Sequence, residues 1–397
     1  MKIAFLVTNY NDRDGIAIYV HELREKCSSS RVYAEQAAQT KDRGIETQYL
    51  RRQSWTLGTY LLEWKFGISF KWLDWLLNSW RERGYRKAVA KLSEFDAVWL
   101  QWSIFSEFGE IFYRLSKLRN RPVLIFDYHG ITPPKFADTK GKRHIMQKAL
   151  FAGGQAANVA DIVITHSKYT RQELSRFSNV KNSEIVHFFY PAKPQVEKLP
   201  SAIMAKIKNK FVLLSFGRIA RHKNLELVIR ALAKINNLQL RYIIAGNDAR
   251  PSLRREKERL LKIATELGVM EQIIFTGEVS EDLKWTLLNL ADIYVLASFH
   301  EGFGWPLIEA MSIPCPVIAS NRGAIPEIVA DSALLFNPDS ETELITQIKK
   351  ITTDQDVYEH YVEKAKDRGR EFTKAKFATR INQIFSLIKL RQAIIRK

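Results

Sequence analysis

Short apolar runs alternate with longer amphipathic segments along almost the whole chain of 397 residues. The short runs have the length and composition of buried strands, and the longer segments carry apolar residues at helical spacing. In the first half, strands are predicted over Ile3–Thr8, Ile45–Leu50, Ala97–Gln101, Val123–Asp127, Ile162–His166 and Ile185–Phe188. In the second half, they are predicted over Phe211–Phe216, Leu240–Ala245, Ile273–Thr276, Ile293–Ala297, Val317–Ser320 and Leu334–Phe336. This alternation predicts an α/β protein with parallel sheets covered by helices on both faces.

The length and the position of prolines predict two domains. A chain of this size exceeds a single ordinary core, and prolines recur between residues 191 and 200, as in an interdomain connector. We therefore expect a first domain over residues 1–195 and a second over residues 196–375. Residues 376–397 are expected to form a C-terminal helix with a basic tail, because apolar residues recur at helical spacing over Phe377–Leu390.

Two glutamates separated by seven residues lie between a predicted strand and a predicted helix. Glu301 follows the apolar run that ends at Ala297, and Glu309 falls inside the helix that begins near Pro306. Between them, Gly302 and Gly304 allow backbone N–H groups to approach a ligand closely, at the helix end that favours anions. This arrangement suits a sugar and a phosphate held side by side. The alternative is a chance pair of glutamates beside a helix-capping turn.

Two cations follow the first strand of the second half. Gly217 permits a sharp exit from that strand, and Arg218 and Lys223 come directly after it. Arginine offers a planar fork for phosphate oxygens and lysine a point charge, so the pair suits a diphosphate, whose charge grows as it departs. A solvated basic turn is the alternative interpretation. Arg221 and His222 match nothing specific and are expected on the surface.

Both stretches resemble a known family. Ser298–Ser312 resembles the E-x7-E element of the retaining family-4 glycosyltransferases of the GT-B fold (glycosyl transferases group 1), and residues 217–224 resemble their G-R-x-x-x-x-K-[GN] signature. The resemblance implies two doubly wound, Rossmann-like domains facing each other across a cleft. It also implies that the C-terminal helix returns to the first domain, and that a hexose is transferred from a UDP- or GDP-hexose to an acceptor hydroxyl with retention.

The resemblance also assigns roles within the second half. It implies that Glu301 lies beside the donor sugar as a catalytic residue and that Glu309 binds the ribose. The donor diphosphate would be bound by Arg218, Lys223, Gly302, Phe303 and Gly304. Residues 275–279 resemble the loop that holds the base through backbone groups, so Gly277 and Glu278 are candidates for ribose or base binding.

In the first half, the resemblance implies two weaker candidates. Many family members carry a histidine after the strand that here ends at Asp127, directed at the donor sugar, which makes His129 the second catalytic candidate. It could hydrogen-bond a sugar hydroxyl or carry a proton, and a local structural bond is the alternative. The family usually has paired glycines in the first loop. This chain keeps Gly15 but has Asp14 beside it, which argues against a direct phosphate contact there.

The sequence predicts neither a metal nor a resident cofactor. Asp12 and Asp14 superficially resemble the metal motif of GT-A enzymes, but their place at the exit of the first strand favours helix capping. Only Cys27 and Cys315 are present, too few for a disulfide framework or a cysteine metal site. A reducing cytoplasm is the expected compartment, and the nucleotide-sugar is expected to act as substrate without a metal.

The net charge of +18 predicts anionic partners. Residues 51–150 alone carry 18 basic against 9 acidic side chains, and five of the nine tryptophans fall within residues 55–80. Tryptophan beside lysine is typical of segments that lie on a membrane surface, although a helix facing the core would give the same stripe. No run of about 18 apolar residues exists to predict a transmembrane helix, and the N-terminus lacks a signal-peptide pattern.

These features together favour a transferase bound peripherally to the inner face of the cytoplasmic membrane. Its expected acceptor is a lipid or lipid-linked glycan, and a soluble sugar or polysaccharide is the alternative. A glycoside hydrolase would also use two carboxylates but has no need of Arg218 and Lys223. A catalytically silent, basic protein that binds membranes or nucleic acid is the alternative of another class, although no specific nucleic-acid recognition motif is present.

Overall fold

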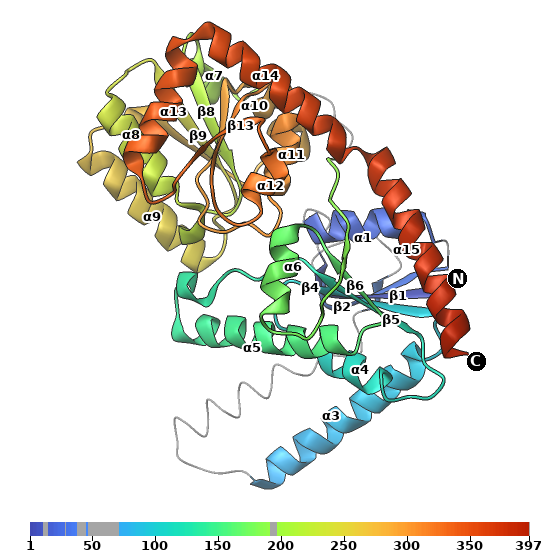
Figure 1. Cartoon of the computed structure of the whole chain (residues 1–397). Coiled ribbons are helices and arrows are strands. Elements are labelled where there is room, and N and C mark those ends of the chain that lie inside the picture. Colours follow the sequence, from blue (N-terminus) through green and yellow to red (C-terminus); the bar gives the residue numbers. More distant parts are fainter. Residues whose placement is uncertain (11–14, 28, 38–44, 47–70, 191–196, 397) are drawn as a thin grey trace.

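The computed structural model describes residues 1–10, 15–27, 29–37, 45–46, 71–190 and 197–396, with side chains omitted for a few of them. These residues build two α/β units, one above the other in Figure 1. The predicted fold class, with two doubly wound parallel sheets and a C-terminal helix, is confirmed. The expected connector at 191–196, the Asp12 and Asp14 pair, and the tryptophan-rich stretch 55–80 fall outside the residues whose side chains are described.

The first sheet has seven parallel strands in the order β3-β2-β1-β4-β5-β6-β7. The strands are β1 (Ile3–Tyr10), β2 (Arg31–Ala37), β3 (Ile45–Glu46), β4 (Ala97–Trp102), β5 (Val123–Tyr128), β6 (Ile162–Thr165) and β7 (Glu184–Ile185). One face packs against α1 (Gly15–Glu25) and α15 (Lys374–Ile395). The other packs against α3 (Lys71–Leu92), α4 (Phe108–Leu115) and α5 (Lys140–Asn158), while α6 (Lys168–Ser175) follows β6.

The second sheet has six parallel strands in the order β10-β9-β8-β11-β12-β13. They are β8 (Phe211–Phe216), β9 (Leu240–Ala245), β10 (Ile273–Gly277), β11 (Ile293–Leu296), β12 (Val317–Ser320) and β13 (Ala333–Phe336). One face packs against α8 (Leu225–Ile235), α9 (Pro251–Glu266) and α13 (Glu341–Thr353). The other packs against α10 (Glu281–Leu290), α11 (Trp305–Met311), α12 (Ile325–Val329) and α14 (Gln355–Gly369), and α7 (Ser201–Ile207) precedes β8.

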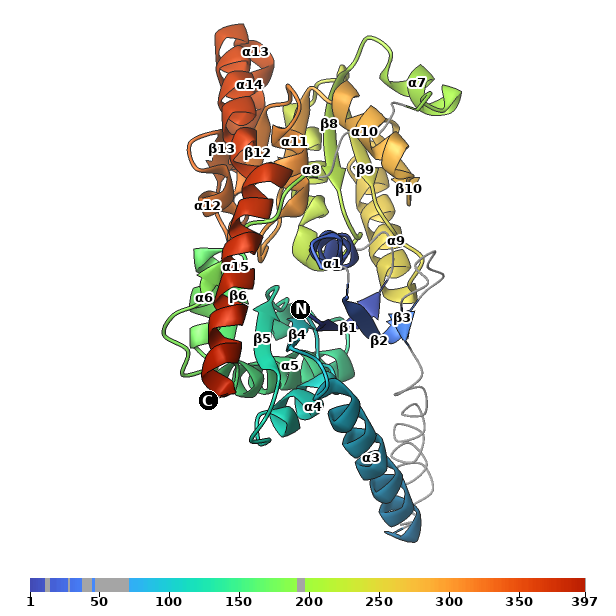
Figure 2. The same ribbon diagram turned by 90° about the vertical axis from the view of Figure 1, so that its right-hand side faces the viewer.

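Helix α15 joins the two units. Figures 1 and 2 show it running from the end of the second unit down along the first. Its apolar stripe, which includes Phe377 and Ile381, is buried in a core that contains residues of both sheets. Arg380 of α15 also donates to the carbonyl of Ile185 in β7, 3.0 Å away. The C-terminal helix therefore returns to the first unit, as predicted.

Three local predictions need correction. Strand β2 was not predicted, because its sequence mixes polar residues with a short apolar run. Its Glu35 accepts a hydrogen bond from the hydroxyl of Ser106, just before α4. The predicted strand Ile185–Phe188 is instead the two-residue β7, after which Val186 and Phe188 are buried outside the sheet. His222, expected on the surface, is 8% exposed, because the turn η2 (Arg221–Lys223) folds it inward toward Phe136.

Among the described residues, no helix combines the length and the apolar character that crossing a bilayer requires.

Candidate active site

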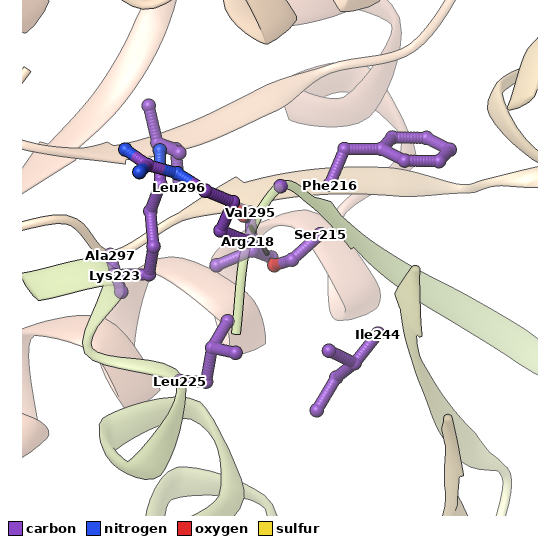
Figure 3. Close-up of a pocket in the computed structure, with 10 residues that line it drawn as sticks. Ser215, Phe216, Arg218, Lys223, Leu225, Ile244, Val295, Leu296 and Ala297 are labelled. Atoms are coloured by element: carbon purple, nitrogen blue, oxygen red, sulfur yellow. Dashed lines mark hydrogen bonds between the residues drawn. The ribbon is translucent and has the colours of Figure 1, made fainter. Parts of the chain in front are cut away.

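The strand order reverses at one point in each sheet, and in the second sheet this point lies between β8 and β11. The chain leaves these two neighbouring strands in opposite directions, which opens a crevice at their carboxyl ends where ligands of such folds bind. A pocket occupies this place (Figure 3). It is lined by Ser215, Phe216, Gly217, Arg218, Lys223, Leu225, Ile244, Val295, Leu296 and Ala297.

Glycines allow the backbone segments at this pocket to approach one another closely. Gly217 has φ +131°, in a region that residues with a side chain rarely adopt. Gly246, after β9, lies so close that a Cβ there would be 1.7 Å from the Gly217 carbonyl oxygen. Gly246 N–H in turn donates to the carbonyl of Gly277, 2.9 Å away. The loops after β8, β9 and β10 are therefore held against one another.

The two predicted diphosphate ligands meet at this pocket. Figure 3 shows the side chains of Arg218 and Lys223 reaching toward the same side of it. Arg218 is exposed, whereas the Lys223 side chain is only 13% exposed. An exposed guanidinium beside a partly buried ammonium is an arrangement that can bind a diphosphate, since both donors are charged.

Glu301 lies directly against Lys223. The Nζ of Lys223 donates to Oε1 of Glu301 over 2.6 Å, and the hydroxyl of Ser298 donates to the same oxygen over 2.7 Å. Burial alone would raise the pKa of Glu301, but the charge and hydrogen bond of Lys223 hold it below the ordinary value. Glu301 is therefore an ionised carboxylate at the side of the pocket where Lys223 lies.

The turn after Glu301 contains three predicted diphosphate-binding residues, which differ in their surroundings. Gly304 has φ +93° and precedes the first residue of α11, and Gly302 approaches the first domain closely. Phe303 is 4% exposed, and its ring packs at a centroid distance of 5.0 Å against Phe188 of the first domain. The Phe303 side chain is thus a core group, and only its backbone remains as a candidate ligand for the diphosphate.

Glu309, the predicted ribose ligand, is on α11 and is 5% exposed. Its Oε1 accepts a hydrogen bond from Nζ of Lys284 over 2.7 Å, and Lys284 also pairs with Glu281 of the same helix, α10. Burial raises the pKa of Glu309 despite the opposing charge of Lys284. Lys284 was not singled out from the sequence, because no local pattern links it to a residue 25 positions away.

The predicted base loop is close to the loop after β9. Gly277 has φ +72°, and the Glu278 carboxylate accepts a hydrogen bond from the Asn247 side chain over 2.6 Å. This contact joins the ends of β9 and β10 beside the pocket that Ile244 lines. Both residues are thus at the sheet edge that carries Arg218.

His129 is enclosed rather than open to the cleft. Its side chain is 5% exposed, and its Nε2–H donates to Oε1 of Gln101 over 2.6 Å. The ring stacks on His166 at a centroid distance of 4.5 Å. Burial, together with the nearby His166, lowers the pKa of His129 to about 3, although Asp127 acts in the opposite direction. His129 is therefore a neutral imidazole whose buried Nδ1 has no hydrogen-bond partner among the described residues.

Asp127, His129 and His166 are the described residues grouped closely enough to hold a metal ion. Asp127 Oδ2 already accepts hydrogen bonds from Trp99 and Tyr19, and Oδ1 lies 2.9 Å from Nε2 of His166. Nδ1 of His166 is 2.7 Å from the Val186 carbonyl oxygen. The members of this cluster therefore already contact one another and their protein neighbours.

Gly15 begins α1 and borders the second domain. A Cβ at this position would be 3.0 Å from the Trp305 ring at the start of α11. Gly15 therefore allows the first helix to approach the element that carries Glu309.

The two half-sites come together at Gly302. A Cβ on this glycine would lie 2.6 Å from the carbonyl oxygen of His129, and its own carbonyl accepts a hydrogen bond from Ser167 over 2.9 Å. Next to it, Nε2 of His300 donates to Oε1 of Glu173 over 3.1 Å. Sequence reasoning missed Ser167, His300 and Glu173, because their partners are more than 100 residues away.

Comparison with known proteins connects this geometry to a class of enzymes. Residues 201–368 match the family model described as glycosyl transferases group 1. The serotype-specific mannosyltransferase WbdA of Escherichia coli is 29% identical over 233 residues, which are 58% of this chain and 28% of that protein. The O-antigen chain mannosyltransferase B of Escherichia coli is 26% identical over 292 residues, or 70% of this chain and 74% of that protein.

A third relative is named for a lipid-linked acceptor. The N-acetylgalactosamine-N,N'-diacetylbacillosaminyl-diphospho-undecaprenol 4-alpha-N-acetylgalactosaminyltransferase of Campylobacter jejuni is 28% identical over 224 residues, or 55% of this chain and 58% of that protein. The chain thus matches only part of the length of several such relatives.

Among solved structures, a sucrose-phosphate synthase from Thermosynechococcus elongatus superimposes with a TM-score of 0.74 at 18% identity, covering 98% of this chain and 100% of that one. Anabaena HepE in complex with UDP superimposes with a TM-score of 0.73 at 18% identity, covering 97% of this chain and 100% of that one. The fold is therefore that of the GT-B glycosyltransferases, and residues 201–368 resemble the glycosyl transferases group 1.

Proposed function

We propose that this chain is a retaining, family-4 glycosyltransferase that moves a hexose from a UDP- or GDP-hexose to an acceptor hydroxyl. The observation that carries the proposal is the pocket at the β8/β11 switch point, which Arg218 and Lys223 line and where Lys223 pairs with the ionised Glu301. Two cations can stabilise the departing diphosphate, and the carboxylate can orient and electrostatically support the sugar. The mannosyltransferase names of the Escherichia coli relatives support a hexose donor.

The proposal also gives roles to the ribose and base candidates and to His129. Glu309 would accept hydrogen bonds from the ribose, and Gly277 and Glu278 would border the base. His129 would act as the catalytic-site residue of the first domain. Because its ring is neutral, we assign it hydrogen bonding to a sugar hydroxyl rather than proton transfer by an imidazolium. Its Nδ1 is buried in this structure, so this role requires the His129 side chain to become exposed when the donor binds. No metal is required, because Arg218 and Lys223 supply the positive charge.

The proposed acceptor is a lipid or lipid-linked glycan on the cytoplasmic face of the membrane. The name of the Campylobacter jejuni relative supports a lipid-linked acceptor. The strongly positive charge supports peripheral binding to anionic lipid. Helix α5 adds exposed Phe151 and Ile145, 67% and 44% exposed, on a helix that also carries Lys148. If the acceptor were a soluble sugar, the same donor site would serve, and the exposed apolar residues of α5 would have no part in acceptor binding.

The test is a transfer assay with a panel of UDP- and GDP-hexoses, without added metal, read by mass spectrometry. Acceptors are presented either as lipid extract in anionic liposomes or as soluble oligosaccharides. Glycosylated lipid formed from one donor, and abolished in Glu301→Gln, is the expected result. Product formed only on soluble sugars would overturn the membrane part of the proposal. No product from any donor, together with no nucleotide binding, would overturn the transferase.

A further inference from the structure

Helix α6 of the first domain contacts the Glu301 loop on both sides of Glu301. Ser167, at the N-terminal cap of α6, donates to the carbonyl of Gly302 over 2.9 Å. Glu173, near the C-terminal end of the same helix, accepts from Nε2 of His300 over 3.1 Å. The residues before and after Glu301 are therefore both bound to one rigid element of the opposite domain.

Glu173 also binds the loop that carries His129. Its Oε2 accepts from the hydroxyl of Tyr128 over 2.7 Å and from the backbone N–H of Ile131 over 3.4 Å. Burial and then the charge of Glu173 raise the pKa of Tyr128 well above its ordinary value, which keeps that hydroxyl a donor. One carboxylate thus contacts residues next to both catalytic candidates, one in each domain.

These contacts are buried. Glu173 and His300 are both 6% exposed, and Tyr128 is 1% exposed. A buried carboxylate is stable only with its donors in place, so each donor is confined to one position. The space around it is also full. A Cβ on Gly130 would lie 3.2 Å from the Cα of Gly302 and 3.6 Å from Oε2 of Glu173.

We infer that Glu173 is a positioning residue for glycosyl transfer, which sets the Glu301 loop against the His129 loop through His300 and Tyr128. The inference rests on the proposed function. Glu173 does not reach the donor pocket and has no chemical step of its own. It acts on the chemical step rather than on nucleotide binding, because Arg218, Lys223 and Glu309 all belong to the second domain.

The test compares Glu173→Gln with Glu256→Gln. Glu256 is a matched control, because it is 8% exposed and pairs with Arg259 and Arg221 inside the second domain. In Glu173→Gln the amide keeps an acceptor oxygen at only one of the two positions, so its N–H group faces either His300 or the Tyr128 and Ile131 donors. We expect kcat to fall about ten- to a hundredfold, since small misplacements of reacting groups cost this much. The Kd for UDP or GDP should be unchanged, and Glu256→Gln should retain the wild-type kcat.

A second pair of variants separates positioning from general stability. His300→Gln keeps an N–H donor for Glu173 and should retain more activity than His300→Ala. The double variant Glu173→Gln with His300→Ala should lose little beyond the larger single effect, because both remove one interaction. Thermal unfolding is measured on every variant.

The outcomes distinguish this inference from the proposed function. If the wild type transfers sugar and Glu173→Gln retains its kcat while its melting temperature falls, Glu173 is only structural and the inference is wrong. The inference would also be wrong if the loss of kcat in the double variant equalled the product of the two single losses. Equal losses of kcat in His300→Gln and His300→Ala would contradict it as well. If the wild type transfers no sugar from any donor, the proposed function itself fails.

Discussion

Lys223 and Glu301, 78 residues apart in sequence, form an ion pair at the pocket between β8 and β11, with Nζ and Oε1 2.6 Å apart. Their side chains are each 13% exposed, so water screens the pair only partly. Lys223 is therefore paired with Glu301 in this structure without a ligand. A bound diphosphate would share the Lys223 ammonium group with the Glu301 carboxylate. This relationship links donor binding to the charge of the catalytic candidate.

The first prediction concerns the diphosphate. Lys223→Met should weaken binding of UDP or GDP about ten- to a hundredfold, the worth of one charge-assisted hydrogen bond. Binding of UMP or GMP should change much less, because the second phosphate is absent. Isothermal titration calorimetry measures both. Lys257→Met is the control, since Lys257 pairs with Asp248 over 2.7 Å outside the pocket. Equal weakening of mono- and diphosphate binding would contradict the assigned contact.

The second prediction concerns the ribose. If the Glu309 carboxylate binds ribose hydroxyls, a 2',3'-dideoxy nucleoside diphosphate should bind wild type about tenfold or more weakly than the parent nucleotide. In Glu309→Gln this difference should shrink, because the charged acceptor has been removed. The affinities for the two nucleotides are compared within each protein, so a general loss of stability would not change their ratio. An undiminished preference for the ribose in the variant would remove Glu309 from the site.

The third prediction concerns the close approach of the two domains. In Gly302→Ala the new Cβ would lie 2.6 Å from the His129 carbonyl oxygen, a backbone atom that cannot turn aside. The loops must separate, and kcat should fall about ten- to a hundredfold with nucleotide affinity unchanged.

Gly84→Ala provides the matched control for this substitution. Gly84 is in α3, and a Cβ there meets nothing within 4 Å. The alanine should leave kcat unchanged and raise the free energy of unfolding by about 0.5–1 kcal/mol, as expected inside a helix. A Gly302→Ala enzyme with wild-type kcat would show that the two loops need not touch.

The fourth prediction concerns pH. Burial, with the charge of Lys223, lowers the pKa of His222 to about 3, so the folded chain keeps this ring neutral while the unfolded chain protonates it near pH 6.5. The contribution of His222 to stability is therefore complete above pH 6.5 and is lost as the pH falls toward 3.

Urea unfolding at several pH values measures this dependence. Between pH 6 and 4, His222→Gln should reduce the slope of unfolding free energy against pH by about 1.4 kcal/mol per pH unit, the value for one proton. His144→Gln, at an exposed position, is the control. In this variant the slope of the unfolding free energy against pH should stay close to that of the wild type. An unchanged slope in His222→Gln would show that His222 is protonated in the folded state.

The sequence predicted the parts of this protein that are locally encoded. Buried parallel strands are continuous apolar runs, so most strands could be located. Strand β2 was missed because Glu35 and Gln36 interrupt its apolar residues. Arg218 and Lys223 stand in one short stretch, and the glycines around Glu301 mark a special turn. Their assignment to a donor site was possible because these signals are contiguous.

The rest depends on long-range packing. Nothing near Glu173 in the sequence indicates that it binds His300, 127 positions away. Lys284 and Glu309 come from different helices, and their pairing depends on how α10 and α11 lie on one face of the sheet. Likewise, the enclosure of His129 by His166 and Phe188 follows from β6 and the segment after β7. Such partners become visible only once the tertiary structure is known.

The most direct test of the account is proton NMR of the protein mixed with an α-linked nucleotide-hexose and its acceptor. The spectrum reports at once the loss of the donor anomeric proton and the configuration of the new linkage. The account predicts that the donor is consumed, that an α-linked product appears, and that Glu301→Gln slows the reaction about a hundredfold or more. A β-linked product would contradict retention, and an unchanged donor with every nucleotide-hexose and acceptor would contradict glycosyl transfer itself.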